Sequence, residues 1–279
     1  MLVYAKIKSV QRKISSLKKG TTIGFVPTMG ALHKGHLSLV EQARKENDIV
    51  IVSIFVNPTQ FDKQEDLVNY PKTIDTDLSL LNSAYCDIVF APAAEEIYAK
   101  NIQSQSFNFD GLEHQMEGKF RDGHFDGVGT IVKRLFEIVN PTKAYFGEKD
   151  FQQLQIIKNM VKNNRIPVKV VGCDIFREAD GLAMSSRNAR LTKEHRDAAP
   201  FIYKTLKQAK TKFGTESAIK VIEWVENEFK NHPLLNLEYF EIANEESLQP
   251  IKEKNNTQKY RAFIAVFAGK IRLIDNISL

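Results

Sequence analysis

Short apolar runs bounded by turn residues recur along the first 175 residues of this 279-residue chain. We expect these runs to be buried β-strands, because a strand that is covered on both faces is apolar almost throughout. The runs are Thr22–Val26, Ile49–Val56, Asp87–Ala91, Lys143–Phe146 and Val168–Gly172.

Between these runs, apolar residues are spaced three and four positions apart, which is the spacing of one face of an α-helix. The segments with this spacing are Leu37–Glu46, Thr73–Asn82, Gly127–Val139 and Phe151–Asn163. Strands that alternate with helices predict a parallel sheet with crossover helices. The sequence therefore predicts an α/β domain with a doubly wound parallel sheet over residues 1–175.

The pattern changes after about residue 176, where helical segments precede strand-like ones. The helical segments are Lys193–Phe213 and Glu216–Lys230, and the strand-like ones are Asn236–Ile242, Tyr260–Ala268 and Ile271–Asp275. Helices followed by strands are typical of an α+β arrangement. We therefore expect a smaller α+β domain over residues 176–279.

Composition adds limits to this picture. Hydrophobic residues make up 43% of the chain and charged residues 26%, as in folded globular proteins. The net charge of +5 suits a phosphate-rich ligand. The lysines are scattered, however, and the densest cluster, Lys204–Lys212, has the spacing of a solvated helix face. We expect no nucleic-acid partner.

Cysteine and hydropathy patterns bear on the cellular location. Cys86 and Cys173 both lie in apolar stretches and lack the spacing of metal ligands, so we expect buried free thiols in a reducing cytosol. No run of 18 apolar residues occurs, so we expect no membrane-spanning helix and a cytoplasmic protein.

Two histidines lie where the first predicted strand gives way to a helix, in the segment Thr28–His36. Ligands of open α/β sheets bind at the carboxyl ends of strands, and a helix N-terminus favours anions. Because they are spaced three positions apart, His33 and His36 can both donate hydrogen bonds to phosphate oxygens. Gly30 permits unusual dihedrals, and Gly35 leaves room for a base or ribose. The alternatives are surface or capping histidines and a two-histidine metal site.

Two segments carry a family resemblance. Pro27–His36 resembles the HxGH signature of the nucleotidyltransferase superfamily, and Val52–Phe61 is similar to the second signature of the pantothenate synthetase family. Other members of the superfamily do not carry the second signature in this form. The resemblance implies a Rossmann-like fold of the HxGH nucleotidyltransferase type. Lys34 occupies a position where members of the family often have an acidic residue. This difference affects the expected local electrostatics but not the roles of the two histidines.

The segment Gly147–Asp150 also follows a predicted strand and opens a helix. Lys149 can supply a mobile cation, and Asp150 can cap the helix or hold a water of a magnesium ion. An ordinary polar loop is the alternative from composition. The resemblance places this segment in the family block that contacts ATP and pantoate.

The segment Asp180–Asn188 looks like the family's counterpart of the KMSKS loop of synthetases. Ser185, Ser186 and Arg187 can grip the outer phosphates as pyrophosphate departs, and a loop at a domain junction can close on a nucleotide. The alternative is a Ser-rich linker.

The resemblance implies ATP-dependent ligation of (R)-pantoate and β-alanine to pantothenate through a pantoyl-adenylate, in the biosynthesis of coenzyme A, by a Mg²⁺-dependent homodimer. It implies that residues 176–279 close over the active site, that Gln60 contacts pantoate and β-alanine, and that Gln153 contacts pantoate. The implied catalytic residues are His33, His36, Lys149 and Arg187. The implied ATP-binding residues are Met29, Gly30, Ala31, Leu32, His33, Lys34, Gly35, His36, Gly147, Glu148, Lys149, Asp150, Phe176, Met184, Ser185, Ser186 and Arg187.

Several weaker candidates and two rival functions remain. Arg121, His124, Tyr70, Asp75 and Asp77 either line the crevice or have surface or packing roles. One rival function is another HxGH nucleotidyltransferase, which would give a stable nucleotide-containing product. The other is a non-catalytic nucleotide- or RNA-binding module, which would bind RNA with a steep salt dependence and turn over no ATP.

Overall fold

The computed structural model describes residues 1–61, 67–98 and 102–279. By their internal contacts these residues form two compact units. Unit 1 comprises Met1–Glu113, Glu117–Glu148 and Gln153–Asp174, and unit 2 comprises His114–Met116, Lys149–Gln152 and Ile175–Leu279. Two short segments that precede residue 175 thus belong to unit 2.

Unit 1 is built on a six-stranded sheet in which every neighbouring pair is parallel. The strands are β1 (Leu2–Tyr4), β2 (Ile23–Thr28), β3 (Ile49–Ile54), β4 (Ile88–Phe90), β5 (Lys143–Gly147) and β6 (Lys169–Cys173). Their order is β1-β4-β3-β2-β5-β6, so the predicted doubly wound parallel sheet is confirmed. The sequence interpretation missed β1, a three-residue edge strand whose Leu2 and Val3 are exposed and give no buried apolar run.

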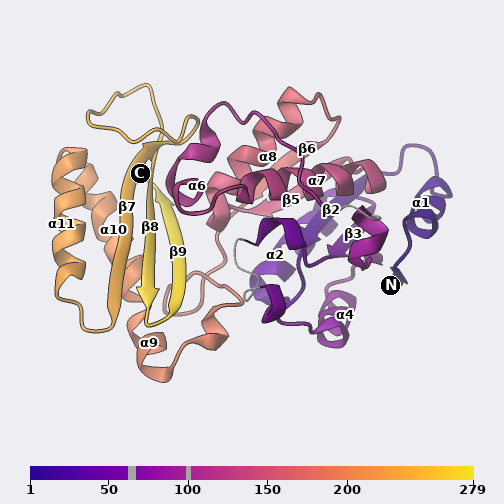
Figure 1. The fold of residues 1–279 in the computed structure, drawn as a ribbon, viewed down its shortest axis with the longest axis horizontal. Helices are drawn as coiled ribbons and strands as arrows, with labels where there is room; N and C mark the ends of the chain where they lie inside the picture. The colour runs from indigo at the N-terminus through magenta and orange to yellow at the C-terminus, as the bar shows by residue number, and fades with distance from the viewer. Residues whose placement is uncertain (62–66, 99–101) are drawn as a thin grey trace. The chain divides into compact units, whose positions relative to one another are not determined.

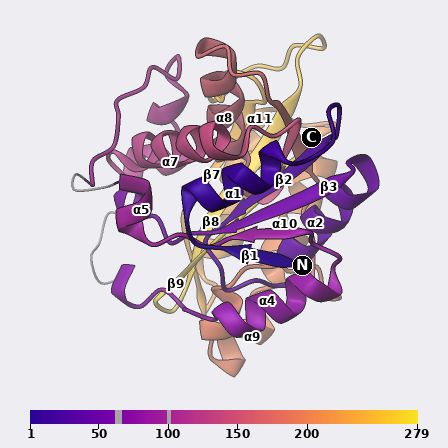
Figure 2. The same ribbon diagram turned by 90° about the vertical axis from the view of Figure 1, so that its right-hand side faces the viewer.

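Helices cover both faces of this sheet. The α-helices that the structure describes before residue 175 are α1 (Ile7–Ser15), α2 (Lys34–Glu46), α4 (Ile74–Ser83), α5 (Ala94–Tyr98), α6 (Met116–Phe120), α7 (His124–Val139) and α8 (Phe151–Asn163). Figures 1 and 2 show α2 and α4 on one face and α1 and α7 on the other. Within the described part of the chain, no helix has the length and apolar character needed to cross a membrane.

The strand order turns at β2. From β2 the chain adds β3 and β4 on one side, whereas β5 and β6 lie on the other. Ligands bind in the crevice at such a switch point, outside the carboxyl ends of the strands. The two segments that leave these ends are the one that follows β2 and the one that follows β5, which starts at Glu148.

A polar cluster ties the C-terminal end of α2 to β5. The Nζ atom of Lys143 lies 2.7 Å from Oε2 of Glu46, and the Tyr145 hydroxyl donates to the same oxygen at 3.0 Å. Hydrogen bonds from Lys143, Gln42 and Tyr145 lower the pKa of Glu46 from 4.5 to about 2. The fold therefore stabilises the charged form of the Glu46 carboxyl group.

Glu46→Gln should reduce stability in a pH-dependent way. A carboxyl group with a depressed pKa stabilises the fold fully above pH 4.5, and this contribution is lost as the pH falls from 4.5 towards about 2. Urea unfolding at a series of pH values should show a difference between wild type and variant that shrinks over this range. Glu41→Gln, exposed on the same helix, is the control. A difference independent of pH contradicts the assignment.

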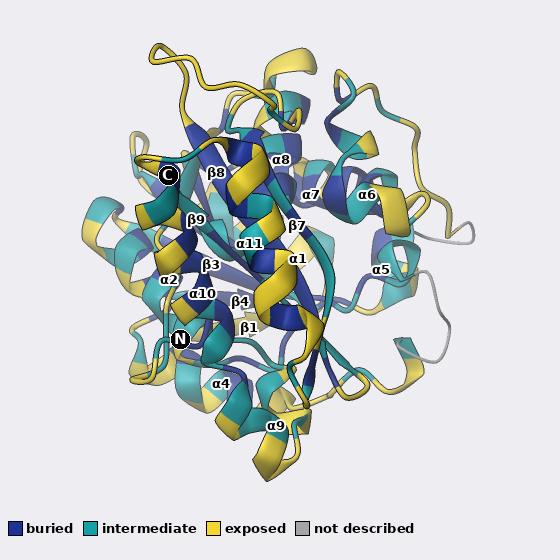
Figure 3. Ribbon diagram, turned by 90° about the vertical axis from the view of Figure 1, so that its left-hand side faces the viewer, coloured by how far each residue is buried: buried dark blue, intermediate teal, exposed yellow. Residues whose placement is uncertain are grey.

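Unit 2 contains a three-stranded antiparallel sheet covered by helices on one face. Its strands are β7 (Leu235–Asn244), β8 (Tyr260–Ala268) and β9 (Ile271–Ser278), in that order, and its helices are α9 (Lys193–Ala198), α10 (Phe201–Phe213) and α11 (Ala218–Lys230). Helix α10 packs on β8 and β9, and α11 packs on β7. Figure 3 shows buried and exposed residues along α11, as expected of a helix with one side on the sheet.

The single helical stretch predicted over Lys193–Phe213 is wrong. It is two helices, α9 and α10, with a break at Ala199 and Pro200. Proline has no backbone N–H and clashes with the preceding turn, so it lies at the start of α10 and not inside a continuous helix.

The two thiols differ in burial. Both cysteines are free, but Cys86 is buried and Cys173 only half-buried, so the expectation of two buried thiols is wrong for Cys173. Desolvation raises the pKa of Cys86 to about 12 and that of Cys173 to about 11. Both groups are therefore protonated and weakly nucleophilic at neutral pH.

Candidate active site

The loop that leaves β2 is held by a buried carboxylate from α4. The backbone N–H of Ala31 donates to Oδ2 of Asp77 at 3.0 Å, and the N–H of Leu32 donates to Oδ1 at 2.8 Å. Asp77 is only 1% exposed. A carboxylate that accepts two backbone N–H groups fixes the loop conformation, in which Gly30 and Ala31 both have positive φ.

Gly30 is needed in this loop for two reasons. Its φ of 82° lies in the left-handed region, and a Cβ atom there would lie 3.0 Å from Oδ2 of Asp77 and 3.1 Å from Cγ2 of Ile54. Any side chain at Gly30 would therefore both strain the backbone and displace the carboxylate that holds the loop.

The sequence analysis gives Asp77 no role different from that of Asp75, although the helical pattern distinguishes the two residues. In the helical pattern, Asp77 shares a face with the apolar residues Ile74, Leu78 and Leu81. An acidic residue on the apolar face of a helix must find buried donors. The structure supplies them from the loop.

Asp77→Asn should destabilise the protein and lower activity together. The amide NH₂ of asparagine cannot accept a backbone hydrogen bond, so one buried N–H of the loop loses its acceptor, at a cost of about 1–3 kcal/mol. Asp75→Asn, exposed on the same helix, is the matched control. Chemical unfolding measures the loss, and equal stability of the two variants would count against this role.

The rings of His33 and His36 lie side by side where α2 begins. Their centroids are 4.0 Å apart with an interplanar angle of 35°, and the backbone N–H of His33 donates to Nδ1 of His36 at 3.3 Å. Because Nδ1 accepts this bond, a neutral His36 carries its proton on Nε2. His36 therefore presents an N–H donor from the far side of its ring.

The turn after β3 brings Gln60 against the same loop. The amide Nε2 of Gln60 lies 3.0 Å from Sδ of Met29, and Nδ2 of Asn57 donates to Oε1 of Gln60 at 3.1 Å. Asn57 is 1% exposed, and its Nδ2 also donates to the carbonyl of Gly127. Met29, Gln60 and the loop thus form one cluster within unit 1.

Arg121 and His124 hold the backbone of Gln60. Nδ1 of His124 lies 2.8 Å from the Gln60 carbonyl, and Nη1 of Arg121 lies 3.0 Å from Nε2 of His124. Arginine only donates, so Nε2 of His124 accepts and its Nδ1–H donates to Gln60. Of the two interpretations left open from sequence, these contacts favour a supporting role for both residues.

The segment after β5 continues into a short 3₁₀ turn, Glu148–Asp150, before α8. The Lys149 side chain is 17% exposed, and its Nζ lies 3.6 Å from Oδ1 of the half-exposed Asp150. The Lys149 carbonyl accepts a hydrogen bond from Nδ2 of Asn276 at 2.9 Å. Gln153 lies in the first turn of α8 and is half-buried.

The segment Phe176–Met184 forms a small hairpin within unit 2. The N–H of Met184 donates to the Phe176 carbonyl at 3.0 Å, and Gly181 turns the chain with a φ of 94°. Arg196 braces the outside of the hairpin through ion pairs with Glu178 and Asp180. The chain that follows carries Ser185, Ser186 and Arg187.

Arg187 is exposed beyond this braced hairpin, and its N–H donates to Oγ of Ser185 at 3.2 Å. The predicted site residues are thus divided between the two units. Unit 1 holds Met29, Gly30, Ala31, Leu32, His33, Lys34, Gly35, His36, Gln60, Gly147, Glu148 and Gln153, and unit 2 holds Lys149, Asp150, Phe176, Met184, Ser185, Ser186 and Arg187.

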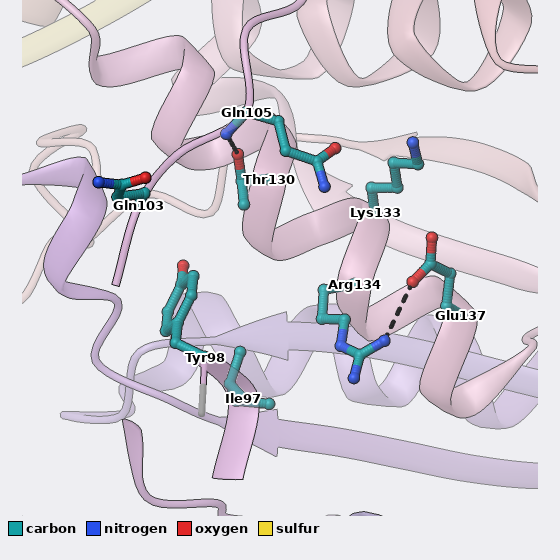
Figure 4. A pocket seen from close by; sticks show the side chains of 8 residues that line it. All are labelled: Ile97, Tyr98, Gln103, Gln105, Thr130, Lys133, Arg134 and Glu137. Atoms are coloured by element: carbon teal, nitrogen blue, oxygen red, sulfur yellow. Dashed lines mark hydrogen bonds and ion pairs between the residues drawn. The ribbon is translucent and has the colours of Figure 1, made fainter. Parts of the chain in front are cut away.

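A cavity of about 270 Å³ in unit 1 lies apart from this set (Figure 4). It is lined by Ile97, Tyr98, Gln103, Gln105, Thr130, Lys133, Arg134 and Glu137. None of the predicted site residues lines it. Its Tyr98 hydroxyl donates to Oδ1 of Asn57 at 2.5 Å, so one wall of the cavity supports the turn that carries Gln60.

Metal ligands of the usual kinds do not gather in the described residues. Over residues 1–61, 67–98 and 102–279 there is no group of three or more His, Cys, Asp and Glu side chains that could hold a metal ion.

Comparison with known proteins covers the whole chain. Residues 2–278 match a family model described as pantoate-beta-alanine ligase. Proteins named pantothenate synthetase from Flavobacterium psychrophilum and Christiangramia forsetii are 56% and 55% identical to the chain, over 100% of it and 100% and 99% of their own lengths.

Solved structures agree. Pantothenate synthetase from Thermus thermophilus superposes with a TM-score of 0.91 at 40% identity, over 99% of both chains. Pantoate-beta-alanine ligase from Francisella tularensis, described as complexed with beta-gamma ATP and beta-alanine, superposes with a TM-score of 0.82 at 38% identity, over 100% of this chain and 97% of its own.

Proposed function

Since the chain belongs to the pantoate-beta-alanine ligase family, we propose that it joins (R)-pantoate to β-alanine with ATP, releasing AMP and pyrophosphate, in the biosynthesis of coenzyme A. The observation that carries this proposal is the loop after β2. Asp77 of α4 fixes the backbone of this loop, and at its end His36 presents an Nε2–H donor beside His33. An N–H donor fixed at the carboxyl end of a strand suits a phosphate ligand.

In the first step, the pantoate carboxylate attacks the α-phosphate of ATP and pyrophosphate leaves. His33, His36, Lys149 and Arg187 are proposed to stabilise the negative charge that develops on the phosphate oxygens. We propose that ATP is held by four further segments of the chain. These are Met29–Gly35, Gly147–Asp150, Phe176 and Met184–Ser186. The exposed Arg187 follows a braced hairpin, which suits a cation that meets the outer phosphates.

In the second step, the β-alanine amine attacks the acyl carbon of the pantoyl-adenylate and AMP leaves with the bridging oxygen. The amides of Gln60 and Gln153 are proposed to bind pantoate, because a neutral amide can meet hydroxyls and a carboxylate without repulsion. Gln60 is proposed to contact β-alanine as well. The His124 bond to its carbonyl keeps this residue in place. The protein acts by positioning and by excluding water, with no covalent enzyme intermediate.

Mg²⁺ is proposed to accompany ATP. This ion prefers oxygen ligands, keeps several waters and is often bound through substrate phosphates with one or two carboxylates. The half-exposed carboxylate of Asp150 fits the role of holding a magnesium water. When bound, the ion would neutralise phosphate charge.

Exchange of pyrophosphate into ATP tests the function. The expected result is exchange that requires pantoate and needs no β-alanine, because adenylation precedes amide formation. Omission of pantoate is the control. Exchange that does not depend on pantoate, or a stable nucleotide-containing final product, would instead favour the rival nucleotidyltransferase.

We also propose that the protein is a homodimer and that it is located in the cytoplasm. The two free thiols suit a reducing compartment. Light scattering coupled to size exclusion should give twice the chain mass of 31.8 kDa. A mass of one chain would contradict the dimer.

A further inference from the structure

Strand β9 carries two adjacent polar residues that are almost completely buried. Asp275 is 4% exposed and Asn276 is 1% exposed. Buried polar side chains are costly unless they are hydrogen-bonded, so their partners show what they hold. The partners described below lie within unit 2.

Asn276 holds the backbone of the segment that carries Lys149. Its Nδ2 donates to the Lys149 carbonyl at 2.9 Å, and its Oδ1 accepts from Nη1 of Arg261 at 2.6 Å. The Arg261 guanidinium is itself fixed by Glu245, at 2.9 Å, and lies 3.8 Å from the centre of the Phe151 ring. Arg261 therefore orients the Asn276 amide through its oxygen, and the amide nitrogen holds the Lys149 carbonyl.

Asp275 holds the hairpin that precedes Arg187. Its two carboxylate oxygens accept from Nη1 and Nη2 of Arg177 at 2.7 and 2.9 Å. Nη1 of Arg177 also donates to the Gly181 carbonyl at 3.1 Å, and the guanidinium stacks 3.6 Å from the centre of the Tyr203 ring. Burial raises the pKa of Asp275 and the Arg177 charge opposes this rise.

The two side chains reach opposite faces of the sheet, because successive residues of a strand alternate. Asp275 pairs in register with Ile264, which belongs to the core beneath the helices. Asn276 pairs with Phe263, whose ring lies 6.0 Å from that of Phe151 on the other face. One strand can thus secure two separate segments.

We propose that Asp275 and Asn276 are a positioning pair for adenylation, with Asn276 setting the backbone of Lys149 and Asp275 setting the hairpin before Arg187. This inference rests on the proposed function, in which Lys149 and Arg187 meet phosphate oxygens. In this proposal neither member of the pair contacts substrate. Each acts by fixing the position of a cationic side chain, Lys149 or Arg187. A displacement of such a group by about 1 Å can reduce the rate about 10²-fold.

Asn276→Asp tests the first half, because aspartate is isosteric, keeps an acceptor for Arg261 and loses the donor to Lys149. We expect kcat of pantoate-dependent exchange to fall about 10-fold or more, with KM for pantoate within about 2-fold. Amide hydrogen exchange over residues 148–152 should become faster. Glu245→Gln removes the charge next to Arg261 but keeps an amide oxygen that can accept from Nε of Arg261, and it leaves the Asn276 bond to Lys149, so it serves as the matched control.

Asp275→Asn tests the second half, since it keeps the side-chain size and removes the charge that Arg177 meets. We expect faster amide exchange over residues 176–187 and a KM for ATP at least about 5-fold higher. Thermal unfolding of every variant separates these effects from loss of stability.

The outcomes are distinct. Wild-type kcat and KM in both variants, or a loss in Glu245→Gln equal to that in Asn276→Asp, would overturn the positioning pair. Failure of the wild-type protein to catalyse pantoate-dependent exchange would refute the proposed function instead. The amide-exchange arm would then still show whether β9 holds the two segments.

Discussion

His36→Ala is expected to lower pantoate-dependent exchange of pyrophosphate by about 10²-fold or more, the scale of losing one transition-state donor. His33→Ala is expected to do the same. The exposed His114→Ala is the control and should retain wild-type exchange. The loss should appear in kcat, because the charge that these rings meet develops in the transition state.

The structure also distinguishes the two nitrogens of His36. Its Nδ1 accepts from the backbone of His33, so Nε2 is the donor for phosphate. The amide of glutamine extends about as far as Nε2, whereas that of asparagine extends only as far as Nδ1. His36→Gln should therefore retain more activity than His36→Asn. The reverse order, or wild-type exchange in both alanine variants, would refute these roles.

Lys149→Met is expected to reduce exchange by about 10²- to 10³-fold, because it removes one cation from the phosphate site at nearly constant side-chain size. The Lys149 side chain is mostly buried, and Asn276 holds its backbone carbonyl, so the charge is not easily replaced by a neighbour. The variant should fold, because a partly buried lysine stem tolerates methionine.

The control for Lys149 is Lys158→Met, which removes the same charge from an exposed position on α8. It should leave exchange within about 2-fold, since exposed charges are screened by salt. Equal effects of the two variants would show that net charge, and not the position of Lys149, governs the reaction.

The sequence predicted most of the architecture because its pattern is strong where the strands are buried on both faces. Runs such as Ile49–Val56 have no other favourable place than the centre of a sheet. The edge strand Leu2–Tyr4 gave no such signal, since it is short and exposed. The break at Pro200 was readable from proline chemistry and was overlooked because the apolar spacing continues on both sides.

The candidate site was predictable only in part. The HxGH spacing located His33 and His36 at a strand-to-helix turn, because this depends on local order along the chain. The supports come from distant residues: Asp77 lies 46 positions from Ala31, and Asn276 lies 127 positions from Lys149. Periodicity within one helix or strand does not report which remote carbonyl or N–H a polar side chain will meet.

The most direct test follows one oxygen atom. Pantoate labelled with ¹⁸O in its carboxylate is incubated with ATP and β-alanine, and the AMP is analysed by mass spectrometry. Attack of the carboxylate on the α-phosphate predicts that AMP carries one ¹⁸O atom and pyrophosphate carries none. Unlabelled AMP, with the label in phosphate or pyrophosphate, would contradict adenylation.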